Sequence, residues 1–145
     1  MNIKTKYHGE LDINEHQMWN FQSGIPGFPA EHEFALYPLS EGDTFSVLQS
    51  TKNENIAFVV ASPFPFFPAY DFELETSIIS QLDIKEKNDV LPLVILTLGD
   101  SMEESTANLQ APVIFNLSNQ KAKQVILHDS GYMTKHPLKH TEREG

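Results

Sequence analysis

The clearest strand in this 145-residue chain is Ile56-Ala57-Phe58-Val59-Val60-Ala61, which follows the polar turn Thr51-Lys52-Asn53-Glu54-Asn55. Its β-branched and aromatic residues favour a strand, and the run is too short for a typical helix. A second apolar stretch, residues 90–98, is entered across Pro92. We expect residues 56–61 to form a central strand and residues 90–98 to form a second buried strand.

Short segments of alternating apolar and polar residues lie on both sides of these two strands. Close spacing of such segments, with turn signals between them, is typical of small barrels and sandwiches. The pattern predicts a mainly β fold: a small antiparallel β-barrel-like or sandwich domain with one or two short helices. The remaining predicted strands are residues 3–7, 9–13, 18–21, 34–39, 45–50, 113–117 and 124–128, with a hairpin connection at 118–121 and turns at 23–29 and 41–43.

One helix is predicted between the two apolar strands. Thr76 or Ser77 can cap its first turn, since a hydroxyl accepts a hydrogen bond from a backbone N–H there. Ile78, Ile79 and Leu82 fall on one helical face, which we expect to be buried.

Composition limits the class of protein. The chain has 10 Lys and Arg against 20 Asp and Glu, a net charge of -10, and no cysteine. Such a surface repels phosphate backbones, so direct nucleic-acid binding is not expected. Absence of cysteine excludes disulfides and thiolate chemistry. We expect one domain over residues 1–138, a frayed tail over 139–145, a cytoplasmic location without membrane contact, and a monomer when the protein is free.

Candidate catalytic and metal sites are weak. Gly99-Asp100-Ser101-Met102 imitates the nucleophile turn of lipase-like hydrolases, but a nucleophilic serine needs a positioned base, and none of the 6 histidines has Asp three residues earlier. We therefore interpret Ser101 as the start of a one- or two-turn helix, with Glu104 as a capping partner. His136 and His140 have a metal-ligand spacing but are separated by Pro137. No catalytic residue, metal or cofactor is expected, and a serine hydrolase at Ser101 is a remote alternative.

The most unusual stretch is Ala61-Ser62-Pro63-Phe64-Pro65-Phe66-Phe67-Pro68-Ala69-Tyr70-Asp71-Phe72. Prolines lack the N–H that a strand ladder needs, so an extended and stiff segment is expected. Two interpretations stay open. Its rings could be exposed to bind a partner, with acidic neighbours steering a basic one. They could instead cover the core, with the prolines shaping a crossover.

Several strings, in this order along the chain, resemble the flagellar assembly factor FliW family. The resemblance extends from Ile3 to Leu138, and it departs from the family at Ser62, where an Asn is expected, and in the tail. The strings are Thr5-Lys6-Tyr7-His8-Gly9-Glu10, Gly24-Ile25-Pro26-Gly27-Phe28, Leu48-Gln49-Ser50-Thr51, the Pro63 to Phe72 stretch, Glu104-Ser105-Thr106-Ala107-Asn108-Leu109-Gln110-Ala111-Pro112 with Asn116, and His136-Pro137-Leu138.

This resemblance implies a non-catalytic regulatory protein. Members of the family bind CsrA, a small basic RNA-binding dimer that represses flagellin translation, and antagonise it allosterically. They also bind flagellin, which sequesters them. When flagellin is exported, the freed protein binds CsrA and flagellin translation resumes. A dedicated flagellin chaperone without control of CsrA is the alternative. On this interpretation the predicted apolar anchors for a partner are Phe64, Phe66, Phe67 and Tyr70, with Asp71, Glu73, Glu103 and Glu104 as a charged rim.

Overall fold

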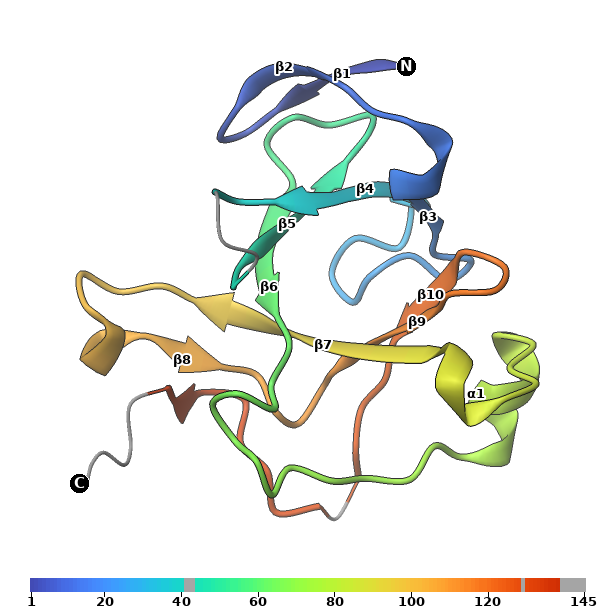
Figure 1. Cartoon of the computed structure of the whole chain (residues 1–145), viewed down its shortest axis with the longest axis vertical. Helices are drawn as coiled ribbons and strands as arrows, with labels where there is room; N and C mark the ends of the chain where they lie inside the picture. The colour runs from blue at the N-terminus through green and yellow to red at the C-terminus, as the bar shows by residue number, and fades with distance from the viewer. Residues whose placement is uncertain (41–43, 129, 139–145) are drawn as a thin grey trace.

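A computed structural model describes residues 1–40, 44–128 and 130–138 (Figure 1). The predicted turn at 41–43 and the predicted frayed tail at 139–145 lie outside these residues. No helix in the described part of the chain has the length and apolar character needed to cross a bilayer. The strands are β1 (Asn2–Thr5), β2 (Gly9–Asp12), β3 (Met18–Asn20), β4 (Glu33–Pro38), β5 (Ser46–Ser50), β6 (Ala57–Ala61), β7 (Val90–Thr97), β8 (Thr106–Ala107), β9 (Val113–Asn116), β10 (Lys121–Gln124) and β11 (His136–Pro137), and the helices are η1 (Glu15–Gln17), α1 (Thr76–Gln81), η2 (Lys87–Asp89) and η3 (Met102–Glu104).

The main sheet closes into a barrel. Its strands follow the order β7-β6-β5-β4-β3-β10-β9, and β9 pairs back onto β7, with Val90 opposite Asn116 and Leu93 opposite Val113. All of these pairs are antiparallel except β3 with β10, which run parallel. Directions cannot alternate all the way around a ring with an odd number of strands, so one parallel pair is required in a seven-strand barrel. The mainly β, barrel-like prediction is confirmed.

The barrel interior is filled by aromatic and aliphatic side chains. Phe21, Phe34 and Phe115 are fully buried, and the ring of Trp19 meets that of Phe115 edge to face at a centroid distance of 4.9 Å. Alternate residues of each strand point inward, as the period of a strand requires. The interior cluster comprises Trp19, Phe21, Ile25, Phe34, Leu48, Val60, Leu93, Val113, Phe115 and Ala122.

A glycine turn inserts one of these residues. Gly24 has φ +69°, and a Cβ there would lie 2.6 Å from the carbonyl oxygen of Phe28, so only glycine fits. The backbone then doubles back, with Ile25 and Phe28 bridged, and Ile25 enters the interior cluster at 2% exposure. The predicted turn at 23–29 therefore closes part of the barrel.

Outer faces of the barrel are covered as well. The β1–β2 hairpin places Ile3 and Ile13 over Tyr37 and Val47 of β4 and β5. On the opposite side, residues 61–72, α1 and residues 125–128 and 130–138 pack against the outward side chains of β6, β7 and β9. Figure 1 shows the hairpin and this second cover on either side of the barrel. Burial on both faces explains why residues 56–61 form a continuous apolar run rather than an alternating one.

Two predicted elements need correction. The strand after the hairpin connection is β10 at Lys121–Gln124, three residues earlier than predicted, because Ala122 points inward between two half-exposed lysines. Helix α1 is capped by Glu75 without a side-chain hydrogen bond, so neither Thr76 nor Ser77 caps it. Its buried face holds Ile78 and Leu82, while Ile79 is 37% exposed.

Candidate functional site

The aromatic segment leaves β6 and forms two successive turns. The N–H groups of Phe66 and Phe67 donate to the carbonyl of Pro63 at 3.1 and 2.8 Å, and the N–H of Tyr70 donates to the carbonyl of Phe67 at 2.9 Å. Pro68 occupies the second position of the latter turn, where its fixed φ is favourable. The expected extended conformation is therefore wrong: the prolines shape a crossover.

Two of the predicted anchors belong to the core. Phe67 and Tyr70 are 7% and 5% exposed. The hydroxyl of Tyr70 donates to the carbonyl of Leu109 at 2.6 Å, its ring meets that of Tyr132 at 4.7 Å, and burial raises the Tyr70 pKa well above its usual value. The prediction that Phe67 and Tyr70 anchor a partner therefore needs correction, since a partner cannot reach buried side chains in this conformation.

Phe64 is the most exposed of the four predicted anchors. Its side chain is 40% exposed, whereas Phe66 is half-buried and stacks on Phe45 with an interplanar angle of 13°. The centroid of the Phe64 ring lies 6.2 Å from that of the buried Tyr70 ring, so one side of the exposed ring packs against the core. A partially supported ring loses little side-chain entropy on binding, which suits a recognition residue.

An acidic ridge follows Phe64 along the chain, and we use this term for Asp71, Glu73 and Glu75. These three side chains are exposed, while the intervening Phe72 and Leu74 are half-buried against the core. Alternate burial points the three carboxylates outward, at the period of an extended backbone. In the described part of the chain none of them forms an ion pair, so their charge is available to a partner.

The other two predicted rim residues lie elsewhere. Glu103 and Glu104 are exposed in η3, which follows the end of β7, whereas the ridge leads into α1, before β7 begins. Figure 1 shows η3 and α1 beyond opposite ends of β7. The Glu104 carboxylate accepts the N–H of Asp100 at 3.2 Å, so it already closes a local turn. The four predicted acids therefore do not form one rim.

Ser101 has no catalytic surroundings in the described residues. Its backbone carbonyl accepts hydrogen bonds from the N–H of Glu104 and the hydroxyl of Ser105. Its own hydroxyl makes no hydrogen bond to a histidine or to any other described residue. His8 and His32 bond instead to backbone carbonyls, at 2.8 and 3.0 Å. The arrangement favours the turn interpretation over a hydrolase.

Metal ligands do not gather in residues 1–40, 44–128 and 130–138: no three His, Asp or Glu side chains lie close enough together to hold an ion. Of the i, i+4 histidine pair, His136 lies on β11 at the rim of the core, and His140 lies outside the described residues.

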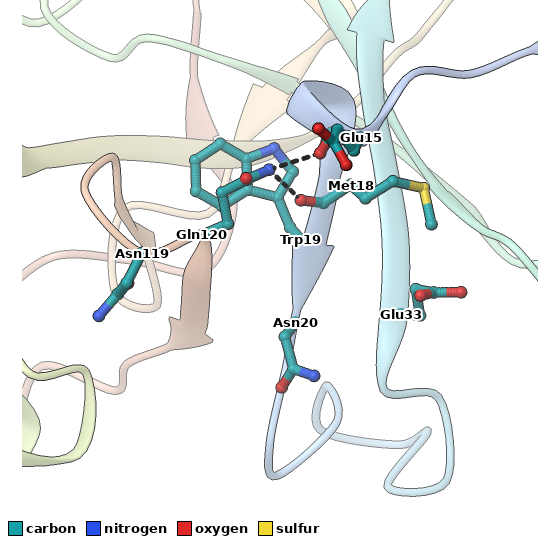
Figure 2. A pocket seen from close by; sticks show the side chains of 7 residues that line it. All are labelled: Glu15, Met18, Trp19, Asn20, Glu33, Asn119 and Gln120. Carbon is teal, nitrogen blue, oxygen red and sulfur yellow. Dashed lines mark hydrogen bonds between the residues drawn. The ribbon is translucent and has the colours of Figure 1, made fainter.

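A shallow pocket of about 200 Å³ lies where β3 meets the β9–β10 turn (Figure 2). Gln120 crosses it, with its amide donating to the carbonyls of Glu15 and Met18 at 2.8 and 2.6 Å. Gln120 also has φ +61°, a conformation that non-glycine residues rarely adopt. These bonds fasten the parallel β3–β10 seam, so the pocket is structural. The lining residues are Glu15, Met18, Trp19, Asn20, Glu33, Asn119 and Gln120.

The structural role of two buried polar residues, Asn116 and Gln49, was not predicted from the sequence. Asn116 is fully buried, and its amide donates to the carbonyls of Leu82 and Asp83, which ties α1 to the β9–β10 turn. Gln49 is also fully buried. The available signal was a polar residue inside an apolar strand, since such residues are buried only when hydrogen-bonded. Asn108 accepts the N–H of Ala111 within a turn.

Comparison with known proteins agrees with the resemblance along the chain. A family model described as FliW protein matches residues 2–138. The chain is 54% identical to the flagellar assembly factor FliW of Bacillus pumilus over 138 residues, which cover 95% of this chain and 96% of that protein. It is 53% identical to the Bacillus subtilis protein of the same name, with the same coverage. A crystal structure of the flagellar assembly factor FliW superposes with a TM-score of 0.92 at 41% identity, over 98% of this chain and 99% of that one.

Proposed function

The chain belongs to the FliW family, and from this premise we propose that it is a regulatory binding protein of flagellar assembly. It binds the translational repressor CsrA and inhibits it allosterically, which relieves repression of flagellin synthesis. Flagellin in turn sequesters it, which returns CsrA to its RNA targets. The protein acts in the cytoplasm, where flagellin is made, and it acts by binding rather than by catalysis.

The observation that carries this proposal is the match over residues 2–138. The family strings also have identifiable places in the fold. Gly24 to Phe28 closes the barrel, Gln49 and Ser50 bond the turn after β5, and Asn108 orders the loop before β9. These three strings therefore maintain the scaffold, whereas the Pro63 to Phe72 string presents the exposed Phe64.

Electrostatics supports a basic partner. A net charge of -10 and an acidic ridge without ion pairs accelerate encounter with a basic protein and repel the RNA that competes for it. An allosteric antagonist also needs differential affinity: it shifts CsrA only as far as it binds the RNA-free form more tightly than the RNA-bound form. The exposed Phe64 provides an apolar anchor, and the acidic ridge, which begins seven residues further along the chain, provides charge.

Calorimetric titration tests the partner switch. We expect the protein to bind CsrA in a saturable complex, and we expect prior saturation with flagellin to abolish that binding. Release of RNA from CsrA, followed by fluorescence anisotropy, should accompany capture. Binding to flagellin alone would contradict the proposal and favour a dedicated flagellin chaperone.

The Phe64 surface gives a sharper prediction. Phe64→Ser should weaken CsrA binding about tenfold or more, because an exposed aromatic anchor is removed. The melting temperature should change little, since the side chain is 40% exposed. Phe28→Ser is the matched control, as that ring is 39% exposed on a different loop. Equal weakening by both variants, or by neither, would remove Phe64 from the interface.

A further inference from the structure

The β1–β2 hairpin forms a two-stranded sheet of its own, outside the barrel. Its register pairs Lys4 with Glu10 and Asn2 with Asp12. Met1 and Ile13 exchange both backbone hydrogen bonds, at 2.7 and 3.1 Å. In an antiparallel pair, hydrogen-bonded and non-hydrogen-bonded positions alternate. The N–H and C=O groups of Glu10 and Asp12 must therefore point away from β1, and we call these outward groups the β2 edge.

The β2 edge is open. Within the described residues no hydrogen bond reaches the backbone N–H or C=O of Glu10 or Asp12, and both side chains are exposed. The edge carries no proline, and no segment among the described residues hydrogen-bonds to it. By contrast, β11 at the outer end of the main sheet carries Pro137, which cannot donate to an added strand. An unprotected edge is a template for pairing with another extended segment.

The negative charge of the β2 edge determines which kind of extended segment can pair with it. Glu10 and Asp12 are two residues apart, so their carboxylates project on the same, solvent-facing side. Lys4 lies opposite Glu10 but forms no ion pair with it in the described structure, and the Asp12 carboxylate already accepts the ammonium of Met1 at 3.1 Å. Both acids repel the edge of a second copy of this chain. They attract a strand that carries basic side chains opposite them.

We propose that the β2 edge binds an extended protein segment with the pattern basic–apolar–basic, by antiparallel strand addition. The two basic residues lie opposite Glu10 and Asp12 and exchange backbone hydrogen bonds with them. The apolar residue between them lies opposite Leu11, which is half-buried and packs on the hairpin core. Backbone bonds provide the attachment, and alternate side chains provide the specificity. Such a segment could belong to any protein, so binding at the β2 edge stands or fails independently of CsrA capture.

The test uses the full chain, labelled with ¹⁵N, and the peptide acetyl-Thr-Lys-Val-Lys-Val-Thr-amide. We expect the amide signals of Glu10 and Asp12 to shift on titration. At saturation we expect their hydrogen exchange to slow about tenfold, because both N–H groups become bonded. The same peptide with glutamate in place of lysine should cause neither effect. In the Glu10→Gln, Asp12→Asn double variant, which keeps the hairpin register, the lysine peptide should bind about tenfold more weakly.

A peptide with N-methyl groups on both lysine backbone nitrogens separates strand addition from simple charge attraction. It keeps both positive charges but cannot donate to the carbonyls of Glu10 and Asp12, so we expect it not to bind. Three outcomes would overturn the proposal: no binding of the lysine peptide, equal binding of its N-methylated form, or signal shifts at the acidic ridge without protection of the β2 edge.

Discussion

Phe115→Ala is expected to lower the free energy of unfolding by about 3–5 kcal/mol, the usual cost of emptying a buried phenylalanine site. Phe115 is fully buried and lies on β9, where the barrel closes onto β7. Its ring meets Trp19 at 4.9 Å and Phe21 at 6.0 Å, both edge to face. The surrounding strands form a closed ring, so the walls cannot collapse into the cavity without breaking their ladders.

Urea denaturation followed by Trp19 fluorescence measures this loss. The melting temperature should fall by about 10 °C or more, given the size of the chain. Leu117→Ala is the matched control: it lies two residues further along, is 51% exposed, and should cost less than about 1 kcal/mol. Equal losses for the two variants would mean that the barrel interior is not the main core.

Gln49→Leu is expected to cost about 2–4 kcal/mol, although the substitution makes the side chain more apolar, because buried polar groups lose their partners. The Gln49 side chain is fully buried on β5. Its Oε1 accepts the N–H of Lys6 at 2.9 Å. The two hydrogens of its Nε2 are shared among the carbonyls of Ser50, Asn53, Glu54 and Ile56, which lie 3.1–3.3 Å from the nitrogen. One amide therefore fastens both the β1–β2 hairpin and the β5–β6 turn to the barrel.

Hydrogen exchange distinguishes this mechanism from a general loss of packing. The amide of Lys6 should exchange faster in Gln49→Leu by more than the global destabilisation accounts for, because its acceptor is gone. Gln81→Ala on the exposed side of α1 is the control and should leave both stability and Lys6 exchange unchanged. An unchanged Lys6 exchange rate in Gln49→Leu would show that the hairpin does not depend on this amide.

Most of the strands were predictable because their signals are local. The predicted strands 56–61 and 90–98 correspond to β6 and β7, since runs of β-branched and apolar residues of that length favour buried strands. The strand β10 begins three residues before the predicted strand 124–128, a difference that arises because its local signal is weak. Its sequence, Lys121–Gln124, is mostly polar, and only Ala122 faces inward.

The candidate site was predictable only in part. Composition and order of residues identified the aromatic segment and its acidic neighbours. They could not show that Phe64 is exposed and Phe67 is buried. Both are phenylalanines that directly precede a proline, Pro65 and Pro68. Their exposure depends on residues distant in the sequence, such as Leu109 and Tyr132, which pack around Tyr70 and fix the turns.

The sequence by itself determined the mainly β class, the central strand, the acidic surface and the family, because each follows from local pattern, composition or ordered motifs. Only the tertiary structure decided the closure of the barrel, its parallel β3–β10 seam, the burial of Phe67 and Tyr70, and the open edge of β2. These features arise from pairing and packing between segments as far apart as Met18 and Gln120. Local propensity contains no information about such contacts, since their free energy exists only once the chain has brought the segments together.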